Sequence, residues 1–133
     1  MGASDTGNGP SADRSQVRCL VVDDHAAVRE GVKMILTRDR EISVIGESGS
    51  GDGAIEMADK RRPDVIVMDV RMPGRDGVEV LRHIGPPPPP VILMTAYASD
   101  ERLAEGGPLA FAVVHKPFSA PHMVDLVSRA RAS

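Results

Sequence analysis

The sequence predicts an α/β fold, a doubly wound sheet of five parallel strands that alternate with five helices. Val65–Met68 is a short apolar run rich in β-branched residues, and a run that is apolar on both faces is typical of a central parallel strand. Similar runs alternate along the chain with segments whose apolar residues recur at helical spacing. This alternation indicates right-handed strand–helix–strand units with helices on both faces of the sheet. A length of 133 residues suits a single domain.

The first half of the chain predicts two strands, Val17–Val22 and Ile42–Ile45, each followed by a helix. The first strand ends in an Asp-Asp pair. The first helix is predicted by apolar residues at helical spacing, which are Val28, Val32, Ile35 and Leu36. Ser50 is a good N-cap for the second helix, and that helix carries an apolar stripe of Ala54, Ile55 and Ala58 before Arg62-Pro63 ends it.

The second half predicts three more strands, Val65–Met68, Val91–Thr95 and Phe111–His115. A helix from about Gly77 to Ile84 follows the first of them, and Pro86–Pro90 then stops it as an extended polyproline connector. The next helix, Asp100–Glu105, is expected to be short because Gly106, Gly107 and Pro108 cut it off. Ser119 caps a last helix with an apolar face of Met123, Leu126, Val127 and Ala130.

Composition excludes several classes of function. Charged residues make up 26% of the chain and the net charge is −3, so we expect no direct binding of nucleic acid by this chain. No apolar run approaches the ~18 residues of a membrane span, and the single Cys19 fits a buried residue in a reducing compartment, so we expect a cytoplasmic protein. Residues 1–16 hold almost no apolar side chain and are expected to be a disordered leader before a domain at 17–131.

Polar residues suited to chemistry stand at the carboxyl ends of four predicted strands. Asp23 and Asp24 follow the first strand, Asp69 the third, Thr95 the fourth and Lys116 the fifth. Each has an ordinary explanation by itself, because Asp caps corners, Thr favours strands and Lys is usually solvated. In a doubly wound sheet, however, the ligand site lies outside the carboxyl ends of the strands, so these residues are expected to share one crevice.

Three converging carboxylates repel one another unless a cation neutralises them. Mg²⁺ suits an open corner of this kind because it takes oxygen ligands at ~2.0–2.1 Å and keeps several waters. With such an ion bound, Asp69 is predicted to act as a nucleophile that accepts a phosphoryl group. Lys116 is expected to pair with one phosphoryl oxygen, and the Thr95 hydroxyl to donate a hydrogen bond to another.

Four motifs together resemble the receiver domain of two-component response regulators. They are V-V-D-D-H at 21–25, V-I-V-M-D-V-R-M-P-G-R-D-G at 65–77, I-L-M-T-A at 92–96 and V-H-K-P-F at 114–118. The resemblance implies a flavodoxin-like (βα)5 fold with strand order 2-1-3-4-5. It implies that Asp69 takes a phosphoryl group from a sensor histidine kinase. It also implies that Asp24 binds Mg²⁺ directly, Asp23 mainly through water, and Arg71 through its backbone carbonyl.

The run D-D-H-A-A-V-R-E-G-V at 23–32 is similar to the NarL/FixJ branch of these regulators. Members of that branch usually carry a helix-turn-helix domain after the receiver. The resemblance therefore implies regulation of transcription through a DNA-binding domain that is not in this chain, and a homodimer on phosphorylation. A stand-alone receiver is the alternative.

The sequence departs from the receiver pattern where an aromatic residue commonly precedes the lysine by three positions. Val113 occupies that position, and Phe111, on the same strand face by alternation, is the candidate to replace the aromatic as the switch partner of Thr95. The Arg71 side chain is expected either to approach the phosphoryl group or to lie solvated in its loop.

Two other functions compete with the phosphorylated switch. A haloacid-dehalogenase-like phosphatase also uses a strand-end Asp, a Thr, a Lys and Mg²⁺, but it usually places an acid/base Asp two residues after the nucleophile, where this chain has Arg71. An atypical receiver that acts as an interaction module without phosphorylation is favoured by Val113 and by the broken fourth helix. We expect no enzyme activity beyond the domain's own phosphorylation and dephosphorylation.

Overall fold

The computed structural model describes residues 16–132. The predicted leader, residues 1–16, lies outside the described residues except for Gln16. The elements follow one another as β2 (Val17–Val22), α1 (Ala26–Thr37), β3 (Ile42–Ser48), α2 (Gly51–Arg61), β4 (Val65–Asp69), α3 (Gly77–His83), β5 (Val91–Thr95), α4 (Leu103–Gly106), the 3₁₀ helix η3 (Gly107–Leu109), β6 (Ala112–His115) and α5 (Ala120–Ala132).

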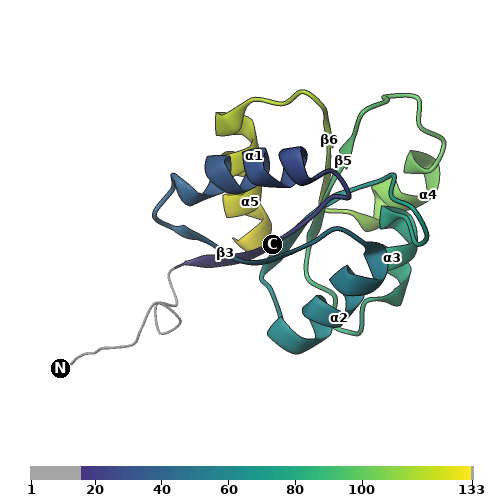
Figure 1. The fold of residues 1–133 in the computed structure, drawn as a ribbon, viewed down its shortest axis with the longest axis horizontal. Coiled ribbons are helices and arrows are strands. Elements are labelled where there is room, and N and C mark those ends of the chain that lie inside the picture. The colour runs from purple at the N-terminus through teal and green to yellow at the C-terminus, as the bar shows by residue number, and fades with distance from the viewer. Residues whose placement is uncertain (1–15, 133) are drawn as a thin grey trace.

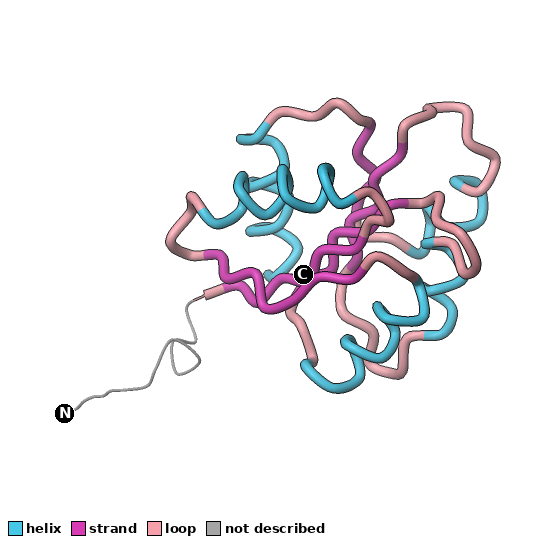
Figure 2. The backbone as a smooth tube through the Cα atoms, in the orientation of Figure 1, coloured by secondary structure: helices cyan, strands magenta, loops and turns pink. Residues whose placement is uncertain are grey.

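The strands of the described chain form one parallel sheet in the order β3-β2-β4-β5-β6. Numbered along the chain, this is the order 2-1-3-4-5, so the predicted doubly wound fold is confirmed. Helices α1 and α5 lie on one face of the sheet, and α2, α3 and α4 lie on the other (Figure 1). The strands run as a twisted layer between these two groups of helices (Figure 2).

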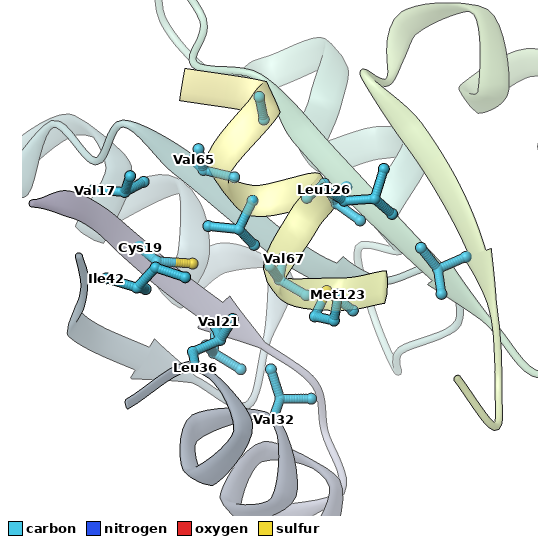
Figure 3. Close-up of a cluster of buried hydrophobic side chains, with 14 of the residues drawn as sticks. Val17, Cys19, Val21, Val32, Leu36, Ile42, Val65, Val67, Met123 and Leu126 are labelled. Carbon is cyan, nitrogen blue, oxygen red and sulfur yellow. The ribbon is translucent and has the colours of Figure 1, made fainter. Parts of the chain in front are cut away.

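Strand alternation divides the core into two clusters, one on each face of the sheet. Cys19, Val21, Val65 and Val67 point to the face covered by α1 and α5, where they pack with Val32, Leu36, Met123 and Leu126 (Figure 3). Leu20, Val22, Ile66 and Met68 point to the other face, toward Ala54, Ala58 and Val80. All four residues of the run 65–68 are fully buried, as the sequence predicts for a central strand.

Helix caps follow the sequence signals. The Ser50 hydroxyl accepts a hydrogen bond from the Gly53 amide at the start of α2, and the Ser119 hydroxyl accepts one from the His122 amide (3.1 and 3.2 Å). The Asp76 carboxylate caps α3 in the same way by accepting from the Glu79 amide (2.9 Å). These contacts satisfy amides that have no partner within the helix.

Several boundaries differ from the sequence prediction. The second strand continues to Ser48, with a register shift opposite Cys19 and Leu20. The fifth strand begins at Ala112, so Phe111 precedes it. The proline run bends at Pro86 and Pro87 and is therefore not one straight polyproline helix. The fourth helix is short, as predicted, because its four residues are followed by the 3₁₀ turn that holds Pro108.

Within residues 16–132, no helix has the length and the apolar character needed to cross a membrane.

Candidate functional site

The register of the sheet brings the predicted site residues to one edge. Val22 is level with Met68 in the β2–β4 pair, so Asp23 and Asp69 leave their strands side by side. Asp69 is level with Met94 in the β4–β5 pair, and Thr95 is level with His115 in the β5–β6 pair. Each of these strands thus places its polar residue within about one position of the same level. The convergence predicted from strand ends is what the structure shows.

Lys116 joins two of the three carboxylates. Its ammonium donates a hydrogen bond to Asp23 Oδ2 at 2.9 Å, and it lies 3.3 Å from Asp69 Oδ1. The Asp23 side chain is fully buried and that of Asp69 is 8% exposed. Buried carboxylates need such partners because an unpaired buried charge is costly. Lys116 therefore supplies positive charge to the group of Asp23, Asp24 and Asp69, which together with the lysine form the acidic corner.

The remaining carboxylate, Asp24, lies in the same cluster, and one of its oxygens accepts no hydrogen bond. Among residues 16–132, its Oδ1 is the one buried side-chain nitrogen or oxygen atom without a hydrogen bond. One oxygen of Asp23, in contrast, accepts a hydrogen bond from the His25 amide at 2.9 Å. Buried oxygens without a partner are rare in native structures and call for an explanation such as an ion.

Electrostatics around Asp69 and Lys116 follow from burial and from these charges. Burial raises the pKa of Asp69. The ammonium of Lys116 opposes this rise, and the negative charges of Asp23 and Asp24 add to it. Burial by itself lowers the pKa of Lys116, but the hydrogen bond to Asp23 and the charge of Asp69 outweigh it, so the pKa is raised. The corner thus holds more negative charge than one lysine balances.

The residues present fit a divalent cation. Ligand atoms of Asp23, Asp24, His25 and Asp69 all lie within 4.8 Å of one another. The donor set is dominated by carboxylate oxygens, which hard ions such as Mg²⁺ prefer, and one of these oxygens is unpartnered. The predicted ligand role of the Arg71 backbone carbonyl remains a prediction.

Thr95 lies at the edge of this corner with its hydroxyl engaged elsewhere. Its side chain is buried, and Oγ1 donates a hydrogen bond to the Tyr97 carbonyl (2.9 Å) while it accepts one from the Tyr97 amide (3.1 Å). A contact to a group on Asp69 therefore requires the hydroxyl to leave these local partners. The Tyr97 side chain is exposed.

Two other residues singled out from the sequence lie away from the carboxylates. The Arg71 guanidinium donates two hydrogen bonds to the Asp100 carboxylate, at 2.8 and 2.7 Å. It is therefore neither free nor simply solvated. Phe111 lies at the amino end of β6, where its amide bonds the carbonyl of Val91, the first residue of β5. At ~3.3 Å per residue this places it roughly 13 Å along the strand from the level of Thr95. Its position does not support a role as the switch partner of Thr95.

Two contacts in and around the site could not be predicted from the sequence. His25 was visible only as a neighbour of the Asp pair, and its approach to both carboxylates depends on how the chain turns into α1. Asp100 carried no signal, because its pairing with Arg71 joins loops that are 29 residues apart.

A family model and two similar proteins relate this chain to response regulators. Residues 19–128 match the model of the family described as "Response regulator receiver domain". The chain is 32% identical over 129 residues to the transcriptional regulatory protein PdtaR of Mycobacterium tuberculosis, covering 92% of this chain and 62% of that protein. It is 38% identical over 91 residues to the DNA-binding transcriptional activator DevR/DosR of the same species, covering 67% of this chain and 42% of that protein. The chain thus spans only 42 to 62% of the length of these two relatives.

A solved structure shares the architecture. The signal receiver domain of the putative response regulator NarL from Mycobacterium tuberculosis superposes with a TM-score of 0.81 at 29% identity. The superposition covers 90% of this chain and 98% of that one.

Proposed function

This chain belongs to the family of response regulator receiver domains, and from that premise we propose that it is a phosphorylation-controlled switch whose phosphoacceptor is Asp69. The observation that carries the proposal is the corner itself. A nearly buried carboxylate at the end of the central strand lies 3.3 Å from a lysine ammonium and beside two further carboxylates. The receiver unit is proposed to span residues 17–131.

The proposed reaction is a transfer of a phosphoryl group between two side chains. An Asp69 carboxylate oxygen attacks the phosphorus of a phosphohistidine on a sensor histidine kinase. The new P–O bond forms as the P–N bond breaks, and the histidine leaves with the electron pair of that bond. Such transfers depend on positioning and on charge neutralisation rather than on a proton shuttle.

The corner supplies both requirements. The Lys116 ammonium is within reach of Asp69 and can pair with a phosphoryl oxygen carried there. Mg²⁺ held by Asp24 and Asp69, with Asp23 beside them, would neutralise charge on the phosphoryl oxygens. Thr95 can exchange its hydrogen bond to the Tyr97 carbonyl for one to a phosphoryl oxygen, which would carry the state of Asp69 into the loop after β5.

The output is proposed from the relatives. DevR/DosR is a DNA-binding transcriptional activator. We therefore place this receiver in the control of transcription, through a DNA-binding domain in the same protein or in a partner, with dimerisation on phosphorylation. Phosphorylation adds about −1.5 to −2 charges at the sheet edge, which is enough to bias a two-state surface.

The test is the intact mass of the protein after incubation with Mg²⁺ and acetyl phosphate. Wild type is expected to gain one phosphoryl group, ~80 Da, and Asp69→Asn to gain none. Asp59→Asn makes the same chemical change on the exposed face of α2 and is expected to behave as wild type. Removal of Mg²⁺ with a chelator is expected to abolish the gain.

Absence of an adduct in wild type, and of any thermal shift with beryllofluoride, would refute the proposal. The chain would then be better described as an interaction module that works without phosphorylation. The phosphatase alternative has no acid/base at its expected position, because Arg71 stands there and is bound to Asp100. Steady release of phosphate from small phosphate esters would be needed to revive it.

A further inference from the structure

The His25 ring lies beside two carboxylates of the acidic site. Its Nδ1 is 3.3 Å from Asp24 Oδ1 and 3.4 Å from Asp23 Oδ1, and it forms a hydrogen bond with neither. The neighbour at 3.3 Å is the same Asp24 oxygen that has no hydrogen-bond partner. The ring nitrogen therefore lies close to one oxygen of each carboxylate.

The spacing of these atoms matches the edges of a coordination shell. Ligand atoms about 2.1 Å from an octahedral ion are about 3.0 Å apart at right angles, and around a tetrahedral ion they are about 3.4 Å apart. Separations of 3.3 and 3.4 Å fall in this range. At these separations a metal ion can meet the nitrogen together with either oxygen.

Helix capping does not account for the histidine. His25 is the N-cap residue of α1, a position that favours Ser, Thr, Asp or Asn because their oxygens accept from the first free amides. The His25 side chain makes no capping hydrogen bond. It is 69% exposed, so it is not part of the core either. The backbone amide of His25, bound to Asp23, instead holds the residue against the acidic corner.

We propose that His25 contributes its Nδ1 as a ligand in the acidic site, so that divalent transition ions bind there more tightly than the carboxylates alone would allow. This inference rests on the proposed function, because it concerns the same acidic site. Imidazole suits later transition ions such as Co²⁺ and Zn²⁺, whereas Mg²⁺ takes oxygen ligands and keeps its waters. Affinity for Co²⁺ should therefore depend on the nitrogen, and affinity for Mg²⁺ should depend on the carboxylates alone.

Isothermal titration of the metal-free protein with Co²⁺ and with Mg²⁺ separately tests this. His25→Phe keeps a ring of similar shape and removes the nitrogen. It is expected to weaken Co²⁺ binding about tenfold or more and to leave Mg²⁺ binding within about twofold. The visible absorption of bound Co²⁺ is expected to move to longer wavelength, because a nitrogen ligand is lost from its field. His122→Asn, which removes an exposed imidazole at the start of α5, is the matched control and is expected to change neither affinity.

His25→Asn provides a second variant with a favourable N-cap residue if the phenylalanine variant folds poorly. The ligand role of His25 would be overturned if His25→Phe weakened the binding of Co²⁺ and Mg²⁺ equally, or left Co²⁺ binding unchanged. Asp69→Asn separates this outcome from failure of the proposed site. If the acidic corner is the binding site, this variant must weaken the binding of both Co²⁺ and Mg²⁺. Binding of both ions that is indifferent to Asp69→Asn, or no binding to wild type, would refute the site and the ligand role together.

Discussion

Replacing Lys116 by methionine removes the cation of the acidic corner and keeps the length of the side chain. In the metal-free protein the variant leaves a fully buried Asp23 and a nearly buried Asp69 without their ammonium partner. Breaking a buried ion pair costs about 3–5 kcal/mol. The loss should lie at or below the lower end of that range, at about 2–3 kcal/mol, because Asp23 keeps the hydrogen bond from the His25 amide and Lys116 is 20% exposed.

The assay is thermal unfolding followed by far-UV circular dichroism in the presence of a chelator. For a domain of this size the expected loss corresponds to a fall in Tm of about 8–12 °C. Lys60→Met is the matched control, because Lys60 pairs with Glu56 at 3.6 Å on the exposed face of α2. Surface pairs of this kind contribute under about 1 kcal/mol, so the control should stay close to wild type.

Mg²⁺ should reverse part of the loss. An ion bound by the carboxylates replaces the missing positive charge, so Mg²⁺ is expected to raise the Tm of Lys116→Met by more than that of wild type. A variant as stable as Lys60→Met, or equal shifts with Mg²⁺ in wild type and variant, would refute the idea that the lysine neutralises this corner.

Three further predictions follow from other parts of the structure. A Cβ at Gly77 would lie 2.6 Å from the backbone carbonyl oxygen of Asp69, so Gly77→Ala should lower the free energy of unfolding by about 1–3 kcal/mol. Gly31→Ala, in open space on α1, is the control and should raise the free energy of unfolding by about 0.5–1 kcal/mol. The reverse order of the two variants in urea unfolding would contradict this prediction. The hydrogen bond from Arg71 holds the pKa of Asp100 below its usual value. The stability that this hydrogen bond gives is therefore present above the pKa of the unfolded state and is lost as the pH falls through the pKa of the folded state. Amide exchange around α4 should speed up below about pH 4, and this pH dependence should disappear in Asp100→Asn. Burial raises the pKa of Cys19 to about 12, so a thiol reagent at neutral pH should react with it at a rate set by unfolding, and rapid reaction in the folded protein would contradict its burial.

Much of the fold was open to prediction because its signals are local. The run 65–68 is apolar on both faces, which indicates a strand covered on both sides, and the structure buries all four residues completely. The alternation of such runs with helical periodicity fixes a parallel sheet, because parallel neighbours need a crossover helix. Asp69 and Lys116 were found for the same reason, since parallel strands all end at one edge and their end residues can be read from the chain.

Tertiary structure alone decided which partners these side chains have. Lys116 could be expected near the carboxylates, but only the packing of β6 against β5 sets its contacts at 2.9 Å from Asp23 and 3.3 Å from Asp69. Strand alternation put Phe111 on a plausible face, yet the strand begins one residue later and its amino end lies far from Thr95. Arg71 turned toward Asp100, which is 29 residues away in the sequence.

His25 shows what the sequence determines and what the tertiary structure decides. The sequence by itself determined that a histidine follows the Asp pair at the end of the first strand. The turn into α1, held by the bond from the His25 amide to Asp23, decided that its ring nitrogen faces two carboxylate oxygens. Periodicity and residue type report the face and the end of an element on which a side chain lies. Contacts between side chains depend on backbone turns and rotamers, which only the assembled core selects.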